Sequence, residues 1–332
     1  MRYELAPMEG ITGYIYRNAY IKYFGDLDRY YTPFIASTGL NHKELNDVLP
    51  EHNTEFKLGP ESDRPRLVPQ ILTNRAEDFL VIADRLGQMG YSHVNLNLGC
   101  PSGTVVSRGR GAGFLQYPQQ LDAFLAEIFQ KCSLDISIKT RVGVSDTAQW
   151  EELLRIYAQY PVEELIVHPR IQRDFYKCPI RWEEMETALG YWERTGCEIP
   201  LCYNGEIHSL AQYQALRQRF PRIGRVMLGR GLLKDPYLAG RLRQWEDGQQ
   251  VPEVTGDIVF PVQRRETLWA FHQELLEGYR TVMSGDQNAL FKMKELWTYF
   301  GESFPEKDKA LKKIRKAGDM VQYEGAVREV FS

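Results

Sequence analysis

Eight short apolar segments recur through the first 235 residues, and stretches with helical periodicity separate most of them. The segments are predicted strands over residues 4–8, 29–36, 66–72, 93–98, 136–142, 164–168, 201–203 and 225–228. Helices are predicted between them over residues 76–89, 119–131, 149–160, 182–194 and 209–219. Strands that alternate with helices are typical of a parallel sheet. Eight such units in about 240 residues favour a closed (β/α)8 barrel, a TIM barrel, over an open sheet.

The pattern changes after Pro236. Residues 247–257 are rich in Gly, Gln, Pro and Glu, and helical periodicity follows them without another strand. Helices are predicted over residues 264–282, 288–300, 307–317 and 320–330. We therefore expect a barrel domain over residues 1–245, a linker over 246–257 and a small C-terminal helical bundle domain over 258–332.

The charge balance limits the choice of partners. Lysine and arginine total 41 against 44 aspartates and glutamates, a formal net charge of −3. A polyanionic partner therefore needs a local basic patch rather than an overall positive charge. One candidate patch is opposed only by Asp308 and consists of Lys307, Lys309, Lys312, Lys313, Arg315 and Lys316. A solvated helix face explains this patch as well as a phosphate-binding surface does.

The five cysteines include no Cys-x-x-Cys pair, so neither a disulfide scaffold nor a zinc site is expected. The amino-terminal segment lacks the apolar stretch of a signal peptide, and no run of about 18 apolar residues occurs in the chain. We expect a soluble, cytoplasmic protein without a metal or a membrane partner. No obligatory protein partner is evident, and a monomer is expected.

Polar and reactive residues gather where the predicted strands end. In a TIM barrel the active site lies at the carboxyl ends of the strands, so residues at these ends meet in space. Seven strand ends carry such residues, which are Pro7, Met8, Glu9, Gln70, Asn97, Cys100, Lys139, Arg141, His168, Arg170, Asn204, Gly205, Glu206, Gly229 and Arg230.

The last two strand ends indicate a phosphate. Gly205 and Gly229 let backbone N–H groups approach an anion at the usual phosphate site of this fold, and Arg230 adds a charged fork. Lys139 and His168 suit the polar edge of a flat ring, and Pro7 with Met8 suits its face. A phosphorylated aromatic cofactor such as FMN fits this set, although each residue taken singly is also explained as a turn glycine or a structural side chain.

Cys100 is the strongest candidate for a catalytic residue. It follows a strand, lies between Gly99 and Pro101, and precedes a glycine-rich run with two arginines at residues 107–113. An isolated cysteine is usually a small buried apolar group. A thiol at a strand end beside a glycine-rich loop is better placed to give or take a proton. Cys178 is a weaker competitor, and Cys202 is expected in the core.

Six segments, in order along the chain, resemble the tRNA-dihydrouridine synthases. Residues 6–10 read APMEG, 94–102 VNLNLGCPS, 138–141 IKTR, 167–170 VHPR, 204–207 NGEI and 227–231 MLGRG. They cover the predicted barrel from end to end, and the segment with Cys100 is the most specific. The first segment is similar to that of bacterial members, and the helical tail matches the tRNA-binding domain of the family in position.

The resemblance implies reduction of the C5–C6 double bond of uridines in tRNA with FMN and NADPH. Hydride from reduced FMN reaches C6 of a flipped-out uracil while Cys100 protonates C5. Asn97 and Arg141 are candidates to stabilise the developing enolate, and Arg170 is a further substrate-binding candidate. The resemblance assigns FMN to Pro7, Met8, Glu9, Gln70, Lys139, His168, Asn204, Gly205, Glu206, Gly229 and Arg230. The basic patch at 307–316 would grip tRNA phosphates.

Three positions depart from the family pattern. Gly103 stands where a polar residue is frequent, Pro169 where a small residue is common, and Tyr203 where Ala or Gly is usual. The bulk of Tyr203 bears on the shape of the flavin pocket. Two alternatives remain: an FMN-dependent barrel reductase of a small molecule, similar to dihydroorotate dehydrogenase, and a non-catalytic RNA-binding protein. The first does not need the basic helix, and the second does not need a thiol at position 100.

Overall fold

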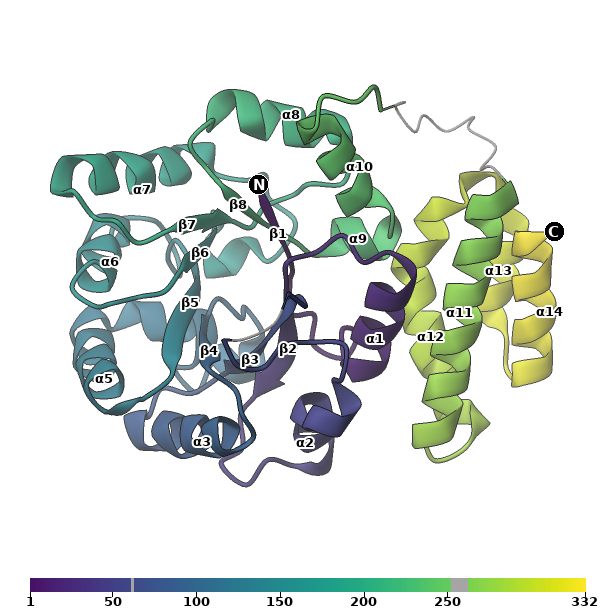
Figure 1. The fold of residues 1–332 in the computed structure, drawn as a ribbon, viewed down its shortest axis with the longest axis horizontal. Coiled ribbons are helices and arrows are strands. Elements are labelled where there is room, and N and C mark those ends of the chain that lie inside the picture. Colours follow the sequence, from purple (N-terminus) through teal and green to yellow (C-terminus); the bar gives the residue numbers. More distant parts are fainter. Residues whose placement is uncertain (61–62, 252–261) are drawn as a thin grey trace. The chain divides into compact units, whose positions relative to one another are not determined.

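The computed structural model describes residues 1–60, 63–251 and 262–332. Its eight strands form a closed barrel in chain order, and β1 pairs in parallel with both β2 and β8 (Figure 1). The strands are β1 Arg2–Leu5, β2 Arg29–Ile35, β3 Arg66–Ile71, β4 His93–Leu98, β5 Asp135–Arg141, β6 Leu165–His168, β7 Leu201–Tyr203 and β8 Arg225–Leu228. The predicted TIM barrel is confirmed.

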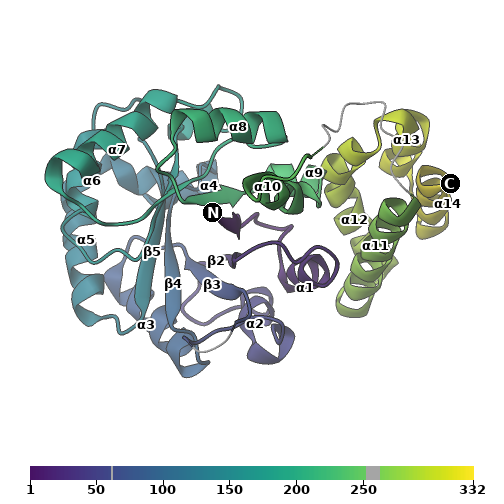
Figure 2. The same cartoon turned by 45° about the horizontal axis from the view of Figure 1, so that its top comes forward.

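The residues described form two compact units, and the first contains the whole barrel. It consists of Met1–Glu9, Asp28–Glu206 and Phe220–Leu228. Its helices are α2 His42–Val48, α3 Ala76–Gln88, α4 Gly103–Val106, α5 Pro118–Lys131, α6 Trp150–Tyr157 and α7 Trp182–Thr195. Figure 2 shows α3, α5 and α6 outside the strands.

The alternation of side chains along the strands explains why the barrel interior is polar at one end. On β4, Val94, Leu96 and Leu98 alternate with Asn95 and Asn97, and all five are buried. Successive residues of a strand point to opposite faces, so the apolar set faces the helix layer while the amides face the interior. The interior end that carries these amides is also the end where the predicted reactive residues gather.

The first strand was predicted in the wrong place. It was expected over residues 4–8, but it ends at Leu5, after which the Ala6 N–H makes one more hydrogen bond to the Leu228 carbonyl. Pro7 has no N–H to continue the ladder. Pro7, Met8 and Glu9 therefore lie in the loop that follows the barrel strand, and the other strands begin and end within one residue of their predicted bounds.

The second unit is helical and consists of Gly10–Leu27, Ile207–Arg219 and Gly229–Ser332. Its helices are α1 Tyr14–Tyr23, α8 Leu210–Arg219, α9 Arg230–Lys234, α10 Leu238–Glu246, α11 Val262–Val282, α12 Asp286–Phe300, α13 Asp308–Lys316 and α14 Met320–Phe331. Aromatic rings fill its core: Phe271 lies against Tyr16 and Phe24, and Trp297 against Phe300.

The helical C-terminal region is confirmed, whereas the predicted linker over 246–257 falls partly on 252–261, outside the described residues. Sequence patterning did not identify α1 or α10, both of which belong to the helical unit. Across the helices that the structure describes, no helix combines the length and the apolar character that a membrane span requires.

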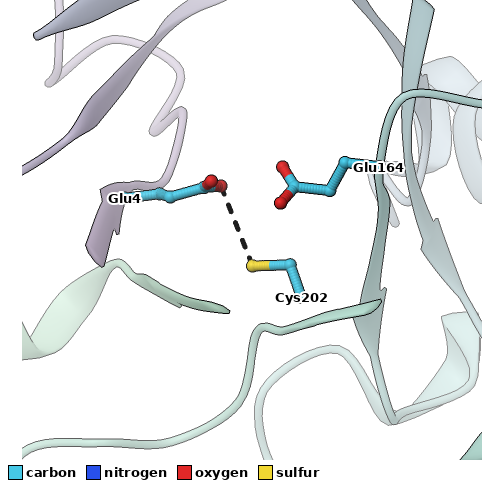
Figure 3. A group of neighbouring side chains, drawn as sticks. All are labelled: Glu4, Glu164 and Cys202. Atoms are coloured by element: carbon cyan, nitrogen blue, oxygen red, sulfur yellow. Dashed lines mark hydrogen bonds between the residues drawn. The ribbon is translucent and has the colours of Figure 1, made fainter. Parts of the chain in front are cut away.

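The amino-terminal end of the barrel is closed by buried charges. Glu4, Glu164 and Cys202 are fully buried, and the Cys202 thiol lies 3.7 Å from a Glu4 carboxylate oxygen (Figure 3). Glu164 accepts hydrogen bonds from Arg225 at 2.8 Å and from Arg29 at 3.4 Å. Burial and the Glu164 carboxylate raise the pKa of Glu4 well above its ordinary value, which favours its protonated form. These buried groups form a charge-balanced layer at the end of the barrel opposite the reactive residues.

Candidate active site

Cys100 is held by a turn that the β4 sequence builds. The Asn97 side-chain oxygen accepts the N–H groups of Gly99 at 3.0 Å and of Cys100 at 2.9 Å. Gly111 packs against the other side with a φ of +55°, and a Cβ atom there would lie 2.9 Å from the Cys100 carbonyl oxygen. Asn97 and Gly111 therefore fix where the thiol stands.

The surroundings of the Cys100 thiol favour its protonated form. Cys100 is partly buried, and burial raises the pKa of its thiol above the ordinary value, although the Ser102 N–H and the Arg141 and Lys139 cations act in the opposite direction. A protonated thiol is a proton donor rather than a nucleophile or a metal ligand. The same cations would stabilise the thiolate that remains after proton transfer.

Arg141 joins two loops at this end of the barrel. Its Nε donates to the Gly99 carbonyl at 2.9 Å, and its Nη atoms donate to the carbonyls of Ile171 at 2.9 Å and Phe175 at 3.0 Å. The side chain is buried. Three backbone carbonyls thus hold this guanidinium and set its orientation.

Gln70 and Asn97 belong to a buried chain of amides. Asn97 Nδ2 donates to Gln70 Oε1 at 2.7 Å, Gln70 Nε2 donates to Asn95 Oδ1 at 2.7 Å, and Asn95 Nδ2 donates to Ser137 Oγ at 2.8 Å. Each buried amide therefore has a partner, as buried polar groups require. This chain connects β3, β4 and β5 and makes the interior beneath Cys100 rigid.

Lys139 carries a charge that this part of the structure does not balance. Burial and the nearby Arg141 guanidinium lower the pKa of Lys139 to about 8. Among the residues that the structure describes, no carboxylate pairs with its ammonium group. On the neighbouring strand, His168 is buried, and its ring stacks on Tyr176 with 6.1 Å between centroids. An unbalanced, half-buried cation is typical of a site that receives an anionic or strongly polar ligand.

The end of β7 carries a second cluster. Asn204 donates to the Met227 carbonyl at 2.9 Å, and Glu206 forms an ion pair with the buried Arg170 at 3.1 Å. Arg170 also donates to the Cys178 carbonyl at 2.7 Å. Arg170, predicted to bind substrate, is therefore paired with Glu206 in this structure.

Tyr203 points away from the barrel interior. Its ring stacks on Trp182 of α7, with 5.6 Å between centroids and 8° between planes. A Cβ atom on Gly205 would lie 2.0 Å from the Tyr203 hydroxyl oxygen, so this tyrosine requires a glycine two residues later. The bulk of Tyr203 therefore fills the helix layer.

The remaining predicted residues lie in both units. Glu9 forms an ion pair with Lys43 of α2, and it follows Pro7 and Met8 in the loop after β1. Gly229 and Arg230 follow β8 directly in the chain, where Gly229 is the N-cap of α9 in the helical unit.

The basic patch lies on α13, whose apolar side is buried through Ala310 and Ile314. Three of its six cations have partners within the helical unit: Lys307 donates to the Ser332 carbonyl, Lys312 pairs with Asp308, and Lys313 pairs with Glu329. Among the described residues, the other three form no ion pair, and all three are exposed. They are Lys309, Arg315 and Lys316.

Sequence reasoning missed the loop between β6 and α7. Gln172 donates to the Pro101 carbonyl at 3.0 Å, next to Cys100, and Asp174 accepts hydrogen bonds from Arg181. No motif marks this loop, because its role depends on contacts with residues about 70 positions away. The signal that the sequence did carry is its run of charged and aromatic residues at 173–177.

The chain is similar in sequence to bacterial proteins with assigned names. A relative from Staphylococcus aureus, named a probable tRNA-dihydrouridine synthase, is 27% identical over 236 residues, which cover 70% of this chain and 69% of the relative. A Bacillus subtilis relative, probable tRNA-dihydrouridine synthase 2, is 26% identical over 238 residues, 71% and 70% of the two chains. Among solved structures, morphinone reductase is 12% identical with a TM-score of 0.47 and covers 77% of this chain and 88% of its own.

The family model of dihydrouridine synthases matches residues 4–317, nearly the whole chain. The match includes the turn that holds Cys100, the barrel strands and most of the helical C-terminal region. The chain therefore belongs to the dihydrouridine synthase family and is a flavin-dependent oxidoreductase.

Proposed function

We propose that this protein is a tRNA-dihydrouridine synthase that reduces the C5–C6 double bond of specific uridines with FMN and NADPH. The observation that carries the proposal is the partly buried thiol of Cys100 near the Lys139 ammonium group, which has no carboxylate partner in the described structure. Burial raises the pKa of this thiol and so favours its protonated form. Family membership and the names of the two relatives support the same activity.

The residues at the reactive end suit FMN. Lys139 offers an unbalanced positive charge to the polar edge of the isoalloxazine, and His168 lies on the adjacent strand β6. Gln70 presents a fixed amide, and Pro7, Met8 and Glu9 supply the neighbouring loop. The phosphate is assigned to Asn204, Gly205, Glu206, Gly229 and Arg230, which follow β7 and β8 as in other barrels of this kind.

When bound at these residues and reduced by NADPH, the flavin would supply the hydride that C6 of the uracil needs. Cys100 gives its proton to C5, so that one hydride and one proton saturate the double bond. The negative charge left on sulfur lies near the Arg141 and Lys139 cations, and solvent then returns the proton. Asn97 and Arg141 support this step by fixing the Gly99–Cys100 peptide group, directly before the thiol.

The RNA requires a surface beyond the reactive end. Lys309, Arg315 and Lys316 of α13 are exposed cations without ion pairs in the described structure, and we assign them to backbone phosphates of the tRNA. Replacing all three with glutamate is expected to raise the KM for tRNA at least about tenfold. The matched control is Lys131→Glu on α5, another exposed lysine, which is expected to leave this KM unchanged.

The function is tested in two steps. Purified protein is expected to bind FMN, shown by its flavin absorbance, and a protein that cannot be reconstituted with FMN would overturn the assignment. With NADPH, the loaded enzyme is expected to form dihydrouridine in unmodified tRNA, measured by mass spectrometry of nucleosides. Reduction of a free pyrimidine with no reaction on tRNA would instead support the small-molecule reductase.

A further inference from the structure

The loop between β6 and α7, residues 171–178, is fastened to the segment that carries Cys100. Gln172 donates to the Pro101 carbonyl at 3.0 Å. The Arg141 guanidinium donates to the Gly99 carbonyl on one side and to the Phe175 carbonyl on the other. Because both connections are made by buried side chains, whatever this loop binds is placed next to the proton donor.

The exposed side chains of this loop are basic and aromatic. Arg173, Phe175, Tyr176 and Lys177 are exposed, whereas Asp174 is buried and bound to Arg181. In the part of the chain that the structure describes, neither Arg173 nor Lys177 takes part in an ion pair. The loop therefore presents two cations and two aromatic rings to solvent without a competing carboxylate of its own.

Phe175 has an unusual backbone for a residue with a side chain. Its φ is +48° and its ψ is −102°, a conformation that L residues rarely adopt. The hydrogen bond from its N–H to the Gln172 carbonyl at 3.1 Å and the one from Arg141 to its own carbonyl hold it there.

This strained residue exposes an apolar ring. The Phe175 side chain is 43% exposed, and among the described residues its ring stacks on no other aromatic ring. The neighbouring Tyr176 differs, since it stacks on His168 and lies 5.4 Å from the Arg141 cation. A strained backbone with an exposed phenylalanine does not stabilise the fold. The exposed ring is, however, available to stack on a ligand with a flat face.

We propose that Phe175 stacks on the RNA base beside the target uridine, while Arg173 and Lys177 bind the flanking phosphates. This inference rests on the proposed function. A uridine that enters the barrel leaves its neighbour in the strand without a stacking partner, and aromatic side chains commonly replace such a partner in RNA complexes. Exposed cations around an aromatic ring are typical of surfaces that bind single-stranded nucleic acid.

Three substitutions at Phe175 test this inference through steady-state kinetics on tRNA. Phe175→Leu keeps an apolar side chain but removes the flat ring, and it is expected to raise the KM for tRNA about tenfold with kcat within about twofold. Phe175→Tyr restores a ring and is expected to restore the KM. Phe175→Gly removes the strain, so its thermal unfolding temperature is expected to equal or exceed that of the wild type while its KM rises as for leucine.

The matched control is Val81→Ala on α3, which shortens another exposed apolar side chain and is expected to leave the KM unchanged. A wild-type KM in both Phe175→Leu and Phe175→Gly, in an enzyme that forms dihydrouridine, would overturn the inference and leave the proposed function standing. A lower unfolding temperature in Phe175→Gly would also count against it, because it would make Phe175 a structural residue. A wild-type protein that forms no dihydrouridine would overturn the proposed function instead.

Discussion

Gly111 has a φ of +55° and lies where a Cβ atom would be 2.9 Å from the carbonyl oxygen and 3.0 Å from the Cβ of Cys100. Both the backbone conformation and the space therefore require glycine. Gly111→Ala is expected to displace the thiol and reduce kcat on tRNA at least about tenfold, since small misplacements of catalytic groups cost large factors in rate.

Gly103 provides the control for this prediction. It lies three residues after Cys100, its φ is not in the left-handed region, and a Cβ atom added there would meet no described atom within 4 Å. Gly103→Ala is expected to keep its kcat within about twofold of the wild type. Equal kcat values for the two alanine variants would show that Gly111 does not set the position of Cys100.

Lys139 has a lowered pKa, of about 8, because its ammonium group is buried near another cation. The unfolded chain holds this proton up to about pH 10.4, so burial costs stability at neutral pH, and the cost disappears as pH rises from about 8 toward 10.4. Lys139→Met is therefore expected to stabilise the protein without cofactor by about 1–3 kcal/mol at pH 7.

Chemical denaturation of both proteins at pH 7 and pH 10 measures this effect, and the difference is expected to shrink at the higher pH. The same variant is expected to bind FMN more weakly, which titration by flavin fluorescence measures. A Lys139→Met protein that is less stable than the wild type would show that the charge is already balanced without a ligand.

At the scale of secondary structure elements, the buried charges at the amino-terminal end of the barrel give Glu4 and Glu164 different roles. The sequence alone does not distinguish these two glutamates. Glu164 pairs with Arg225 and lies near Arg29, which is itself paired with Glu163. Glu4, next to Glu164 and Cys202 in Figure 3, favours the protonated form. Glu164→Gln is expected to destabilise the barrel by about 2–4 kcal/mol, because Arg225 loses its carboxylate partner while Arg29 keeps its ion pair with Glu163. Glu4→Gln, which mimics a protonated acid, is expected to change stability by less than about 1 kcal/mol.

Urea unfolding of the two variants under the same conditions compares these effects. Equal losses would show that Glu4 is ionised and that both carboxylates are needed to balance the arginines.

The elements of the barrel could be predicted because alternating apolar residues mark each strand and each amphipathic helix locally. The end of β1 was placed too late, because the apolar run continues to Met8 although Pro7, which lacks an N–H, stops the ladder after Ala6. Short α1 was missed because the face it buries is made of tyrosines, Tyr16, Tyr20 and Tyr23, rather than aliphatic residues. Its partner on this face is Phe271 of α11, about 250 residues further along the chain.

The candidate site shows the same limit. Residue type and strand position predicted Cys100 and Lys139 as site residues, and the structure shows what surrounds them. The sequence could not show that Arg141 is held by three backbone carbonyls or that Arg170 pairs with Glu206, because these contacts join loops far apart in the chain. The loop at 171–178 was missed for the same reason.

At the scale of the whole molecule, each unit contains a histidine that burial keeps neutral. Burial lowers the pKa of His93 in the barrel to about 4 and that of His272 in the helical unit to about 3. His272 hydrogen-bonds to the Tyr323 hydroxyl at 2.6 Å. Unfolded histidine takes up a proton below about pH 6.5, whereas these two buried rings stay neutral in the folded protein. Each therefore lowers the free energy of unfolding by up to about 1.4 kcal/mol for every pH unit below that value, and has no such effect above it.

Calorimetry between pH 7 and pH 5 tests this pH dependence, and the stability of the wild type is expected to fall with the pH. His272→Gln is expected to be less stable at pH 7 but to lose less between about pH 6.5 and pH 5. A variant whose pH dependence matches the wild type would show that His272 does not titrate on unfolding.

The proposed mechanism depends on donation of a proton by the Cys100 thiol, and the most direct test of this role is the turnover of tRNA by Cys100→Ala. This variant is expected to bind FMN and to be reduced by NADPH as the wild type is, because the flavin residues remain. Its rate of dihydrouridine formation, measured by mass spectrometry under saturating NADPH, is expected to fall at least about 100-fold, the usual contribution of a general acid. A rate close to that of the wild type would contradict this role and move the proton donor to another residue.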